Sequence, residues 1–373
     1  MSQLNRLIEI SRFYGDNPDF VIAGGGNTSY KDSETLWIKA SGIPLAGIGE
    51  DGFVSLSRKG LAQIEDGSFS DDPVLREEEV KEQMKKAIIA PKGLRPSVET
   101  SLHNLIDYSY VIHTHPTLIN ALMCANDVEK EVKARFGEKA ILVEYTDPGY
   151  ILFKKVQERI ASFKTEHGQV PRIIFLQNHG VFVGGNTLEE IKALYVEIDL
   201  KIREGKDLGL PSVETSPYNT QVTESIASYF ASRSMLALSV DAELISHFTA
   251  SSSRLQLISK PFSPDIIVYC KSNYLFLEPN VTAVDIRGLV EEFESKHGYY
   301  PKVIVQEGGG LTVVEESEKS LLTVKEVFLD LMKISYLSEQ FGGPHFMTPG
   351  QISFIDNWEV EHYRRKVAKG KVQ

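Results

Sequence analysis

The spacing of hydrophobic residues divides roughly the first 205 residues into alternating helices and strands. Short runs rich in β-branched and aromatic residues predict strands at 36–40, 53–56, 110–115, 140–145 and 172–177. Apolar residues recur at helical spacing over 3–14, 117–125, 151–163 and 188–202. Helices interleaved with strands indicate an α/β fold. A Gly-, Pro- and Ser-containing stretch at 205–220 predicts a linker between domains at 1–210 and 222–373.

The second part of the chain repeats a pattern of the first. Residues 166–174 resemble 296–304, and the paired positions are 130 apart (296 − 166). The match continues through the segments and predicted helices that follow, and 266–268 is the expected equivalent of 141–143. These matches predict an internal duplication of a strand–helix–strand–helix unit. The second copy is degenerate, because it has Gly309 where the first has His179 and it lacks paired histidines.

Candidate metal chemistry lies in the strand predicted at 110–115, which contains His113 and His115. Residues two apart in a strand point to the same face, so the two imidazoles can supply two ligands to a zinc-like ion. The alternative is a pair of ordinary polar residues on a solvent-facing strand. His179 follows another predicted strand and precedes a glycine, which makes it accessible as a third ligand.

A candidate acid/base residue precedes the paired histidines. Glu99 lies 14 residues before His113 (113 − 99) and follows Pro96 and Ser97, which can open a helix at about 98–107 with Ser97 as its cap. The alternative role for Glu99 is a helix-start carboxylate favoured by the helix dipole. His103 lies on the same predicted helix and is interpreted as structural, because it has no partner at ligand spacing.

Two small turns near the N-terminus are candidate anion-binding loops. Gly24, Gly25 and Gly26 precede Asn27, and a second turn contains Ser41 and Gly42. Glycines let the backbone approach a ligand closely, and backbone N–H groups with hydroxyls form anion-binding concavities. The alternative is a pair of ordinary strand-to-strand turns. Nearby, Lys39 either adds positive charge or is a solvated strand residue.

Composition limits the classes of partner. The 373 residues carry a formal net charge of −11 with a pI of about 5.4, which argues against a nucleic-acid surface and for a soluble cytoplasmic protein. The first residues lack the apolar core of a signal peptide, and no long apolar run predicts a membrane span. Neither Cys124 nor Cys270 lies in a CxxC pair, so no disulfide framework or cysteine-type zinc site is expected.

Five motifs in this order resemble one family. They are Gly26-Asn27-Thr28-Ser29, Ala40-Ser41-Gly42, Pro96-Ser97-Val98-Glu99, His113-Thr114-His115 and Asn178-His179-Gly180. Over about residues 5–205 the chain resembles class II sugar aldolases of the fuculose/rhamnulose-phosphate aldolase and adducin-head type. As a whole it resembles the aldolase part of bifunctional rhamnulose-1-phosphate aldolase/alcohol dehydrogenase proteins.

The resemblance implies an α/β/α sandwich around a largely antiparallel central sheet, in a homo-oligomer with active sites between subunits. It implies that Zn²⁺ or another divalent ion is held by His113, His115 and His179, and that Glu99 is the acid/base residue. It places the substrate phosphate among Asn27, Ser41, Gly42 and Ser97. Val98 departs from the family pattern, which often has a second hydroxyl at this position.

The implied reaction is retro-aldol cleavage of a ketose 1-phosphate of the rhamnulose/fuculose type to dihydroxyacetone phosphate and an aldehyde. Candidates for a second proton donor are Glu144, Tyr145 and Tyr150. The alternatives are a pentulose-phosphate 4-epimerase and a non-catalytic adducin-like scaffold. Adducin-type heads lack the full ligand set, so the complete set here favours an enzyme. Since no GxGxxG motif opens a predicted helix, a separate dehydrogenase subunit is a further possible partner.

Overall fold

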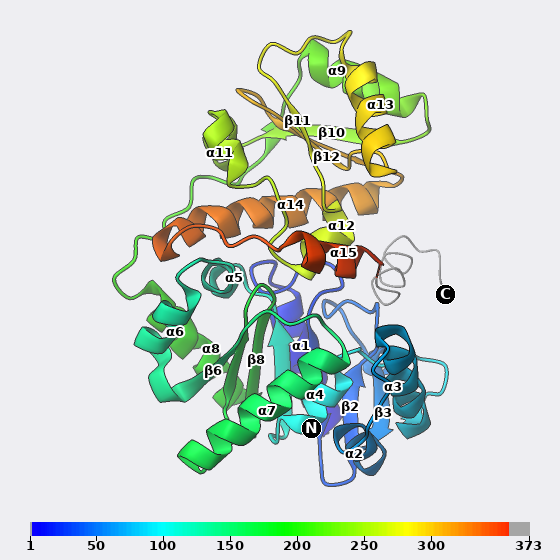
Figure 1. Cartoon of the computed structure of the whole chain (residues 1–373), viewed down its shortest axis with the longest axis vertical. Coiled ribbons are helices and arrows are strands. Elements are labelled where there is room, and N and C mark those ends of the chain that lie inside the picture. Colours follow the sequence, from blue (N-terminus) through cyan, green and yellow to red (C-terminus); the bar gives the residue numbers. More distant parts are fainter. Residues whose placement is uncertain (1, 358–373) are drawn as a thin grey trace. The chain divides into compact units, whose positions relative to one another are not determined.

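The computed structural model describes residues 2–357, which fall into two compact units (Figure 1). The first unit comprises residues up to 123 together with 128–205. The second comprises 124–127 and the described residues from 206 onward. The end of the predicted second domain, 358–373, lies outside the described residues. The domain boundaries predicted from the sequence remain a proposal.

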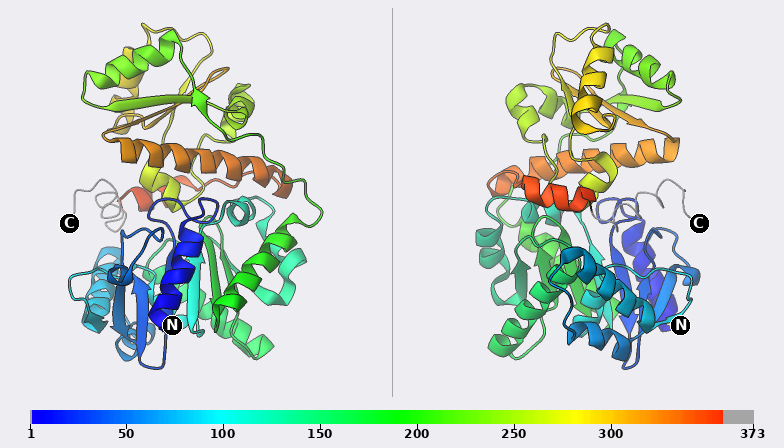
Figure 2. Two further views of the ribbon diagram at one scale, coloured as in Figure 1. Left: turned by 180° about the vertical axis from the view of Figure 1, so that it is seen from behind. Right: turned by 45° about the vertical axis from the view of Figure 1, so that its right-hand side comes forward.

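The first unit contains an eight-stranded sheet and helices on both of its faces (Figures 1 and 2). Its strands are β1 (Asn27–Lys31), β2 (Thr35–Lys39), β3 (Phe53–Ser57), β4 (Ile88–Ala90), β5 (Tyr110–Thr114), β6 (Ala140–Val143), β7 (Ile173–Leu176) and β8 (Gly180–Gly185). Its helices are α1 (Gln3–Gly15), α2 (Arg58–Glu65), α3 (Pro73–Ala87), α4 (Thr100–Leu105), α5 (Thr117–Met123), α6 (Val128–Phe136), α7 (Tyr150–His167) and α8 (Leu188–Arg203), with 3₁₀ turns η1 (Glu50–Gly52) and η2 (Gly137–Lys139).

The strand order is β4-β3-β2-β1-β5-β8-β7-β6. Within this sheet only β6 and β7 pair in parallel, and the other neighbours are antiparallel. The predicted α/β fold with a largely antiparallel central sheet is therefore confirmed. A purely parallel sheet would need a crossover between every pair of neighbours, whereas antiparallel neighbours can be joined by short turns.

Each face of this sheet has its own packing. On one face, apolar residues of β2 and β3 pack against α2 and α3, and those of β5, β7 and β8 pack against α4 and α7. On the other face, Tyr14 of α1 contacts Tyr195 of α8, with ring centroids 4.6 Å apart. Thr114 belongs to this second face, because its hydroxyl lies 2.6 Å from the Tyr195 hydroxyl. His113 and His115 therefore point to the α4 face.

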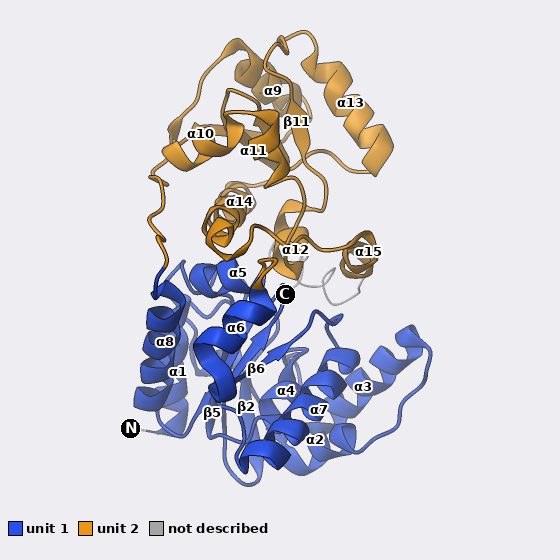
Figure 3. Ribbon diagram, turned by 60° about the vertical axis from the view of Figure 1, so that its left-hand side comes forward, with its two compact units in different colours: residues 1–123, 128–205 blue, residues 124–127, 206–373 orange. Residues whose placement is uncertain are grey.

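The second unit, orange in Figure 3, contains a sheet whose five strands have the order β11-β12-β13-β10-β9. Its strands are β9 (Ser216–Pro217), β10 (Leu236–Asp241), β11 (Leu275–Leu277), β12 (Val303–Gln306) and β13 (Leu311–Glu315). Its helices are α9 (Gln221–Ala231), α10 (Glu243–Thr249), α11 (Ser252–Gln256), α12 (Pro264–Cys270), α13 (Ile286–His297), α14 (Glu318–Ser338) and α15 (Pro349–Asn357), with a 3₁₀ turn η3 (Glu339–Phe341).

The second sheet reproduces five strands of the first in the same order and directions. The parallel pair β11–β12 corresponds to β6–β7, and the antiparallel neighbours β13, β10 and β9 correspond to β8, β5 and β1. Ile173 lies opposite Val183 in the first unit, and Val303 lies opposite Val313 in the second, at the same offset of 130 (303 − 173). The shared topology and register support the predicted internal duplication.

Backbone hydrogen bonds recur at matching places in the two units. Asn178 donates to the Met123 carbonyl at 3.1 Å, and Gly308 donates to the Thr249 carbonyl at 2.7 Å. One element was paired wrongly from the sequence. Residues 266–268 lie in α12 and not in a strand, and the equivalent of β6 is β11. A continuous apolar run of this length does not distinguish a buried helix from a buried strand, which explains the error.

The described residues contain no helix with both the length and the apolar character needed to cross a membrane.

The duplicated turn provides a test of backbone conformation. Gly308 has φ 68° and its equivalent Asn178 has φ 56°, and no atom would lie within 4 Å of a Cβ at Gly308. We expect Gly308→Ala to destabilise the second unit by about 1–2 kcal/mol, and Gly308→Asn by less, because Asn tolerates left-handed backbone. Calorimetry of the full chain measures the fall in Tm, about 2–4 °C per kcal/mol. Equal losses in both variants would contradict the conformational explanation.

Candidate metal centre and active site

Three histidines meet where β5 ends and β8 begins, at the centre of the first sheet. His113 lies in β5, His115 follows it, and His179 immediately precedes β8, the strand paired with β5. The ring centroid of His113 lies 4.7 Å from that of His115, and His179 lies 5.0 and 5.1 Å from the two. One nitrogen of each ring lies within 4.8 Å of the others. Among residues 2–357 this is the one group of three or more His, Cys, Asp or Glu side chains that could hold a metal ion. The three side chains predicted as ligands therefore converge.

The turn between β7 and β8 explains the order Asn-His-Gly. Asn178 adopts φ 56°, which reverses the chain and presents His179 to the other two rings. A Cβ on Gly180 would lie 2.5 Å from the Thr114 carbonyl oxygen and 2.7 Å from Cδ2 of His115. Glycine is therefore required at this position for the close approach of β8 to β5.

Hydrogen bonding fixes which nitrogen of His113 faces the site. Its Nδ1 lies 3.0 Å from the carbonyl oxygen of Val181, which can only accept, so Nδ1–H donates. The neutral ring then has its lone pair on Nε2, 2.9 Å from Nε2 of His115. Two ring nitrogens at this distance need a shared proton or a shared cation.

Glu99 faces the same point from the start of α4. It is 9% exposed, and its Oε2 accepts a hydrogen bond of 2.6 Å from Nδ2 of Asn27. Its Oε1 lies 3.3 Å from Nε2 of His113 and 3.6 Å from Nε2 of His179. This Oε1 is buried and has no hydrogen-bond partner in the described part of the chain. A buried oxygen in this state is costly unless a proton or a cation neutralises it.

This donor set fits a divalent metal ion. Three neutral imidazoles with one open coordination position are a usual arrangement of catalytic zinc sites, with Zn–N distances of about 2.0–2.1 Å. The unpartnered oxygen of Glu99 and the converging lone pairs are the features that such an ion would satisfy.

The first predicted anion-binding loop is connected to the second by Lys39. Its Nζ donates to the carbonyl of Ile43 at 2.7 Å and to that of Gly24 at 3.3 Å. The side chain is only 3% exposed, so the alternative of a solvated strand residue is wrong. Gly26, at φ 64°, lies against β5, and a Cβ there would be 2.8 Å from the His113 carbonyl oxygen. The glycine loop and the metal-site strand are thus in direct contact.

The remaining predicted phosphate residues lie on adjoining segments. The N–H of Ser41 donates to the Arg95 carbonyl at 2.8 Å, which brings the Ser41–Gly42 turn beside the segment that contains Ser97. Ser97 does not cap a helix as predicted. Its hydroxyl accepts from the N–H of Glu99 at 3.3 Å, and α4 begins at Thr100 with Glu99 in the capping position. Their role in phosphate binding remains a prediction.

Asn27 is engaged beside the metal site. Its Nδ2 binds Glu99, and its Oδ1 is hydrogen-bonded to Nε2 of His103. His103 is fully buried, and its Nδ1 lies 2.7 Å from the hydroxyl of Ser29. The sequence interpretation gave His103 no partner in the site and therefore missed these contacts. Its position four residues after Glu99 was the available signal, since i and i+4 share a helix face.

The three candidates for a second proton donor differ in availability. Although partial burial acts to raise it, hydrogen bonds from Lys155 and Arg159 lower the pKa of Glu144 to about 2. The Tyr150 hydroxyl donates to the Gly67 carbonyl at 3.1 Å. Burial, with Asp147 nearby, raises the pKa of Tyr145, which therefore stays protonated at neutral pH.

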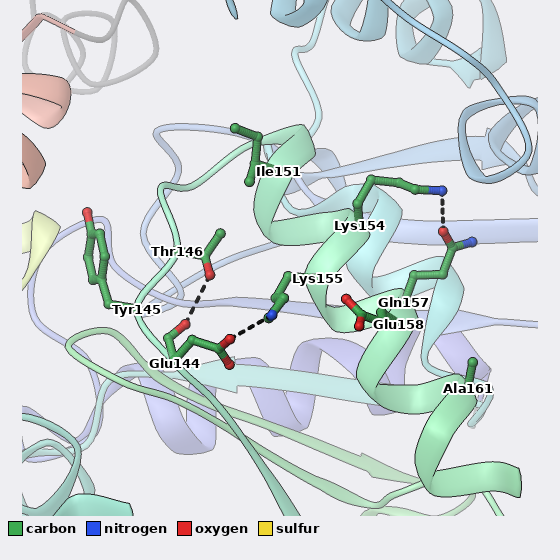
Figure 4. Close-up of a pocket in the computed structure, with 9 residues that line it drawn as sticks. All are labelled: Glu144, Tyr145, Thr146, Ile151, Lys154, Lys155, Gln157, Glu158 and Ala161. Atoms are coloured by element: carbon green, nitrogen blue, oxygen red, sulfur yellow. Dashed lines mark hydrogen bonds and ion pairs between the residues drawn. The ribbon is translucent and has the colours of Figure 1, made fainter. Parts of the chain in front are cut away.

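Glu144 and Tyr145 also line a surface pocket of about 720 Å³ along α7, together with Thr146, Ile151, Lys154, Lys155, Gln157, Glu158 and Ala161 (Figure 4). In this pocket Oε1 of Glu144 lies 2.6 Å from Nζ of Lys155. The Tyr145 ring points away from both of these side chains (Figure 4). The backbone N–H of Tyr145 donates to the side chain of Gln177, two residues before His179, at 3.2 Å. The backbone of Tyr145 is thus hydrogen-bonded to the segment that leads into the metal-site turn.

The second unit has other residues at the three ligand positions. The register of β10 against β13 matches that of β5 against β8, so Ser239 stands for His113 and Asp241 for His115, at an offset of 126 (239 − 113). Gly309 stands for His179, as predicted. Asp241 is occupied by the N–H of Ala242 at 2.8 Å and the hydroxyl of Ser246 at 3.0 Å. The equivalent place in this unit therefore stabilises the start of α10.

The chain belongs to the Class II Aldolase and Adducin N-terminal domain family, whose model matches residues 5–203. This confirms the resemblance and supports the predicted class, an aldolase-type lyase enzyme. The matched residues lie in the first unit, and the second unit lies outside the match, apart from 124–127.

Two curated relatives match part of the chain. An uncharacterized oxidoreductase, YuxG of Bacillus subtilis (strain 168), is 28% identical over 195 residues, which are 50% of this chain and 27% of that protein. A methylthioribulose-1-phosphate dehydratase of Leptospira interrogans is 29% identical over 146 residues, which are 37% of this chain and 50% of that protein. The chain thus matches half or less of the length of these relatives.

Solved structures similar to this chain cover a little over half of it. The N-terminal class II aldolase domain of a Thermoplasma acidophilum protein is 26% identical with a TM-score of 0.46, over 54% of this chain and 92% of that chain. An L-fuculose 1-phosphate aldolase is 20% identical with a TM-score of 0.38, over 57% of this chain and 92% of that chain.

Substitution of Gly180 tests whether the close approach of β8 to β5 is needed for metal binding. We expect Gly180→Ala to displace His115 and to weaken zinc binding by about 10–100-fold, the range for changes that disturb ligand orientation. Gly310→Ala is the matched control, because its Cβ would lie 2.7 Å from both Tyr218 and the Val240 carbonyl in the unit that lacks histidine at the three ligand positions. Competition with a chromophoric chelator measures the affinity. Equal zinc affinity in both variants would contradict the assignment of the metal site to these strand ends.

Proposed function

We propose that the first unit catalyses metal-dependent retro-aldol cleavage of a ketose 1-phosphate of the rhamnulose/fuculose type. The products would be dihydroxyacetone phosphate and an aldehyde such as lactaldehyde. The observation that carries the proposal is the buried Oε1 of Glu99, which has no hydrogen-bond partner among the described residues and faces Nε2 of His113 and His179. A proton-transferring carboxylate beside a cation site is what this cleavage requires. Membership of the aldolase family supports it.

The proposed cofactor is Zn²⁺ or another divalent ion held by His113, His115 and His179. When bound, it supplies Lewis-acid stabilisation of the negative charge that develops on substrate oxygens during cleavage. Because Nδ1–H of His113 is hydrogen-bonded to the Val181 carbonyl, Nε2 is the nitrogen of this ring that is available as a ligand.

Glu99 is the proposed acid/base residue. When the C3–C4 bond breaks, its electron pair remains on C3 of the three-carbon fragment, and Oε1 delivers a proton to that carbon. In the reverse direction Oε1 removes this proton. Because Oε2 already accepts from Asn27, Oε1 is the oxygen available for transfer.

In the condensation direction a second group must donate a proton to the oxygen that becomes the C4 hydroxyl, and Tyr145 stays protonated. Of the three candidates Tyr145 is favoured, because Glu144 is held as a carboxylate by two cations and Tyr150 is bound to the Gly67 carbonyl.

The phosphate is assigned to Asn27, at the start of β1, and to the segments that contain Ser41, Gly42 and Ser97. Ser41 and Ser97 lie on adjoining segments, and turns of this kind offer backbone N–H groups to an anion. The proposal includes a cytoplasmic homo-oligomer that binds neither nucleic acid nor membrane.

A substrate screen tests the reaction. We expect zinc-loaded protein to release aldehyde from rhamnulose 1-phosphate or fuculose 1-phosphate, and Glu99→Gln to lower kcat by about 10²–10⁴-fold, the usual contribution of a positioned acid/base. A coupled aldehyde reductase measures the release. Absence of cleavage of every phosphoketose by zinc-loaded protein would overturn the aldolase proposal.

The same screen distinguishes the alternatives. Pentulose 5-phosphates epimerised at C4 would indicate an epimerase. Loss of water from methylthioribulose 1-phosphate would indicate the reaction named for the Leptospira relative. Failure to bind any divalent ion would indicate an adducin-like scaffold.

The third ligand has its own test. We expect His179→Ala to lower zinc stoichiometry after dialysis against a weak chelator, because two imidazoles do not complete the three-ligand set of a catalytic site. His297→Ala is the control, since this residue ends α13 in the second unit. Atomic absorption measures the bound metal, and unchanged stoichiometry in His179→Ala would show that the third ligand is another residue.

A further inference from the structure

One face of β1 is polar, although it is buried against α4. Asn27, Ser29 and Lys31 are spaced two apart and therefore share this face, and each is at most 5% exposed. Asn27 and Ser29 bind the His103 ring, and Asn27 also binds Glu99. Lys31 donates to the carbonyls of His103 and Ile106 at 2.7 and 2.6 Å. A buried strand face is normally apolar, so this arrangement needs a reason beyond packing.

The hydrogen bonds along this face have one consistent direction. The Glu99 carboxylate can only accept, so Nδ2 of Asn27 donates to it, and Oδ1 of Asn27 is left as an acceptor. Nε2–H of His103 must then donate to Oδ1. In the neutral ring Nδ1 is an acceptor, and the hydroxyl of Ser29 donates to it. The chain of donors runs from Ser29 through His103 and Asn27 to Oε2 of Glu99.

His103 is held in this orientation from several sides. The side chain is fully buried, and its ring lies edge-on to Phe182 with centroids 5.4 Å apart. The backbone N–H of His103 donates to the Glu99 carbonyl at 3.1 Å. Burial lowers the pKa of His103 well below its ordinary value, with further contributions from His113 and Lys31, so the ring stays neutral. Water has no access to replace a missing donor here.

We propose that His103 is a positioning residue, which holds the amide of Asn27 in one orientation and thereby fixes the Glu99 carboxylate with Oε1 toward the three imidazoles. Its role rests on the proposed function, because it acts through Glu99. An Asn27 amide turned by half a revolution would place Oδ1 against Oε2, two acceptors in contact. The flipped amide would also turn its Nδ2 toward Nε2–H of His103, two donors in contact, so the His103 donor adds a second barrier to that orientation.

Two variants of His103 separate the donor from the bulk of the side chain. The amide nitrogen of Gln reaches about as far as imidazole Nε2, whereas that of Asn reaches only as far as Nδ1. We expect His103→Gln to keep kcat within about threefold of wild type and His103→Asn to lower it by about 10–100-fold, the effect of a misplaced catalytic group. KM and zinc stoichiometry should be unchanged in both. Equal kcat in the two variants, or a loss that appears in KM or bound zinc, would overturn the proposal.

A spectroscopic readout needs no activity. In ¹⁵N-histidine-labelled, zinc-loaded full-length protein, we expect the long-range ¹H–¹⁵N spectrum to show His103 protonated on Nε2 alone from about pH 6 to 9, where an ordinary histidine loses its charge. His103→Gln identifies the resonance by its loss. Protonation on Nδ1, or on both nitrogens, would overturn the proposal even where a variant does not fold. If wild-type protein cleaves no phosphoketose, the proposed function fails, and this spectrum still decides whether His103 donates to Asn27.

Discussion

The pairing of β5 with a strand on each side is the constraint on which the site depends. Asn27 of β1 lies opposite His113 on one side, and Phe182 of β8 lies opposite it on the other. A slip of one residue in either pairing would turn a set of side chains to the opposite face of the sheet. Phe182 stacks on the His113 ring with centroids 4.1 Å apart and touches His103 as well, so packing and register reinforce each other. The metal site is therefore fixed by the rigid centre of the sheet, although His179 itself comes from a turn.

Comparison with the second sheet shows which residues the fold requires and which are present for the chemistry of the site. The reversal at Gly308 and the close approach at Gly310 repeat those at Asn178 and Gly180, so both features belong to the fold. The histidines do not recur, since serine, aspartate and glycine occupy their positions, and Asp241 is satisfied by groups at the start of α10. In the first unit the corresponding groups converge on Glu99 and leave Oε1 without a hydrogen-bond partner among residues 2–357. Both copies of this turn fold, but histidine is present in only one of them. The fold therefore does not require histidine, and its presence beside Glu99 has a chemical reason.

The sequence predicted the parts of this site that follow from local spacing. Alternation placed His113 and His115 on one face, and a histidine beside a strand end placed His179 within reach. The contacts of Lys39 and His103 could not be predicted in this way, because their hydrogen-bond partners are distant in sequence. Lys39 binds the Gly24 carbonyl, 15 residues away, and His103 binds Asn27, 76 residues away. The start of α4 was also misplaced, since proline and serine are compatible with a helix start at Ser97, and only the bond from the Glu99 N–H to the Ser97 hydroxyl shows the later start. The pairing of 266–268 with β6 failed because apolar composition alone does not set a helix apart from a strand.

The polar face of β1 connects stability with function. Burying an amide, a hydroxyl and an ammonium group costs free energy unless each finds its partners, and here each does, on α4. An apolar face would pack α4 equally well, but it would leave the Glu99 side chain free to choose between rotamers. Directional hydrogen bonds fix the orientation of a carboxylate, which hydrophobic contact does not, because hydrophobic contact has no preferred direction. The buried polar contacts between β1 and α4 thus serve to specify one arrangement of the site, and the surrounding apolar core supplies the stability that makes this arrangement tolerable.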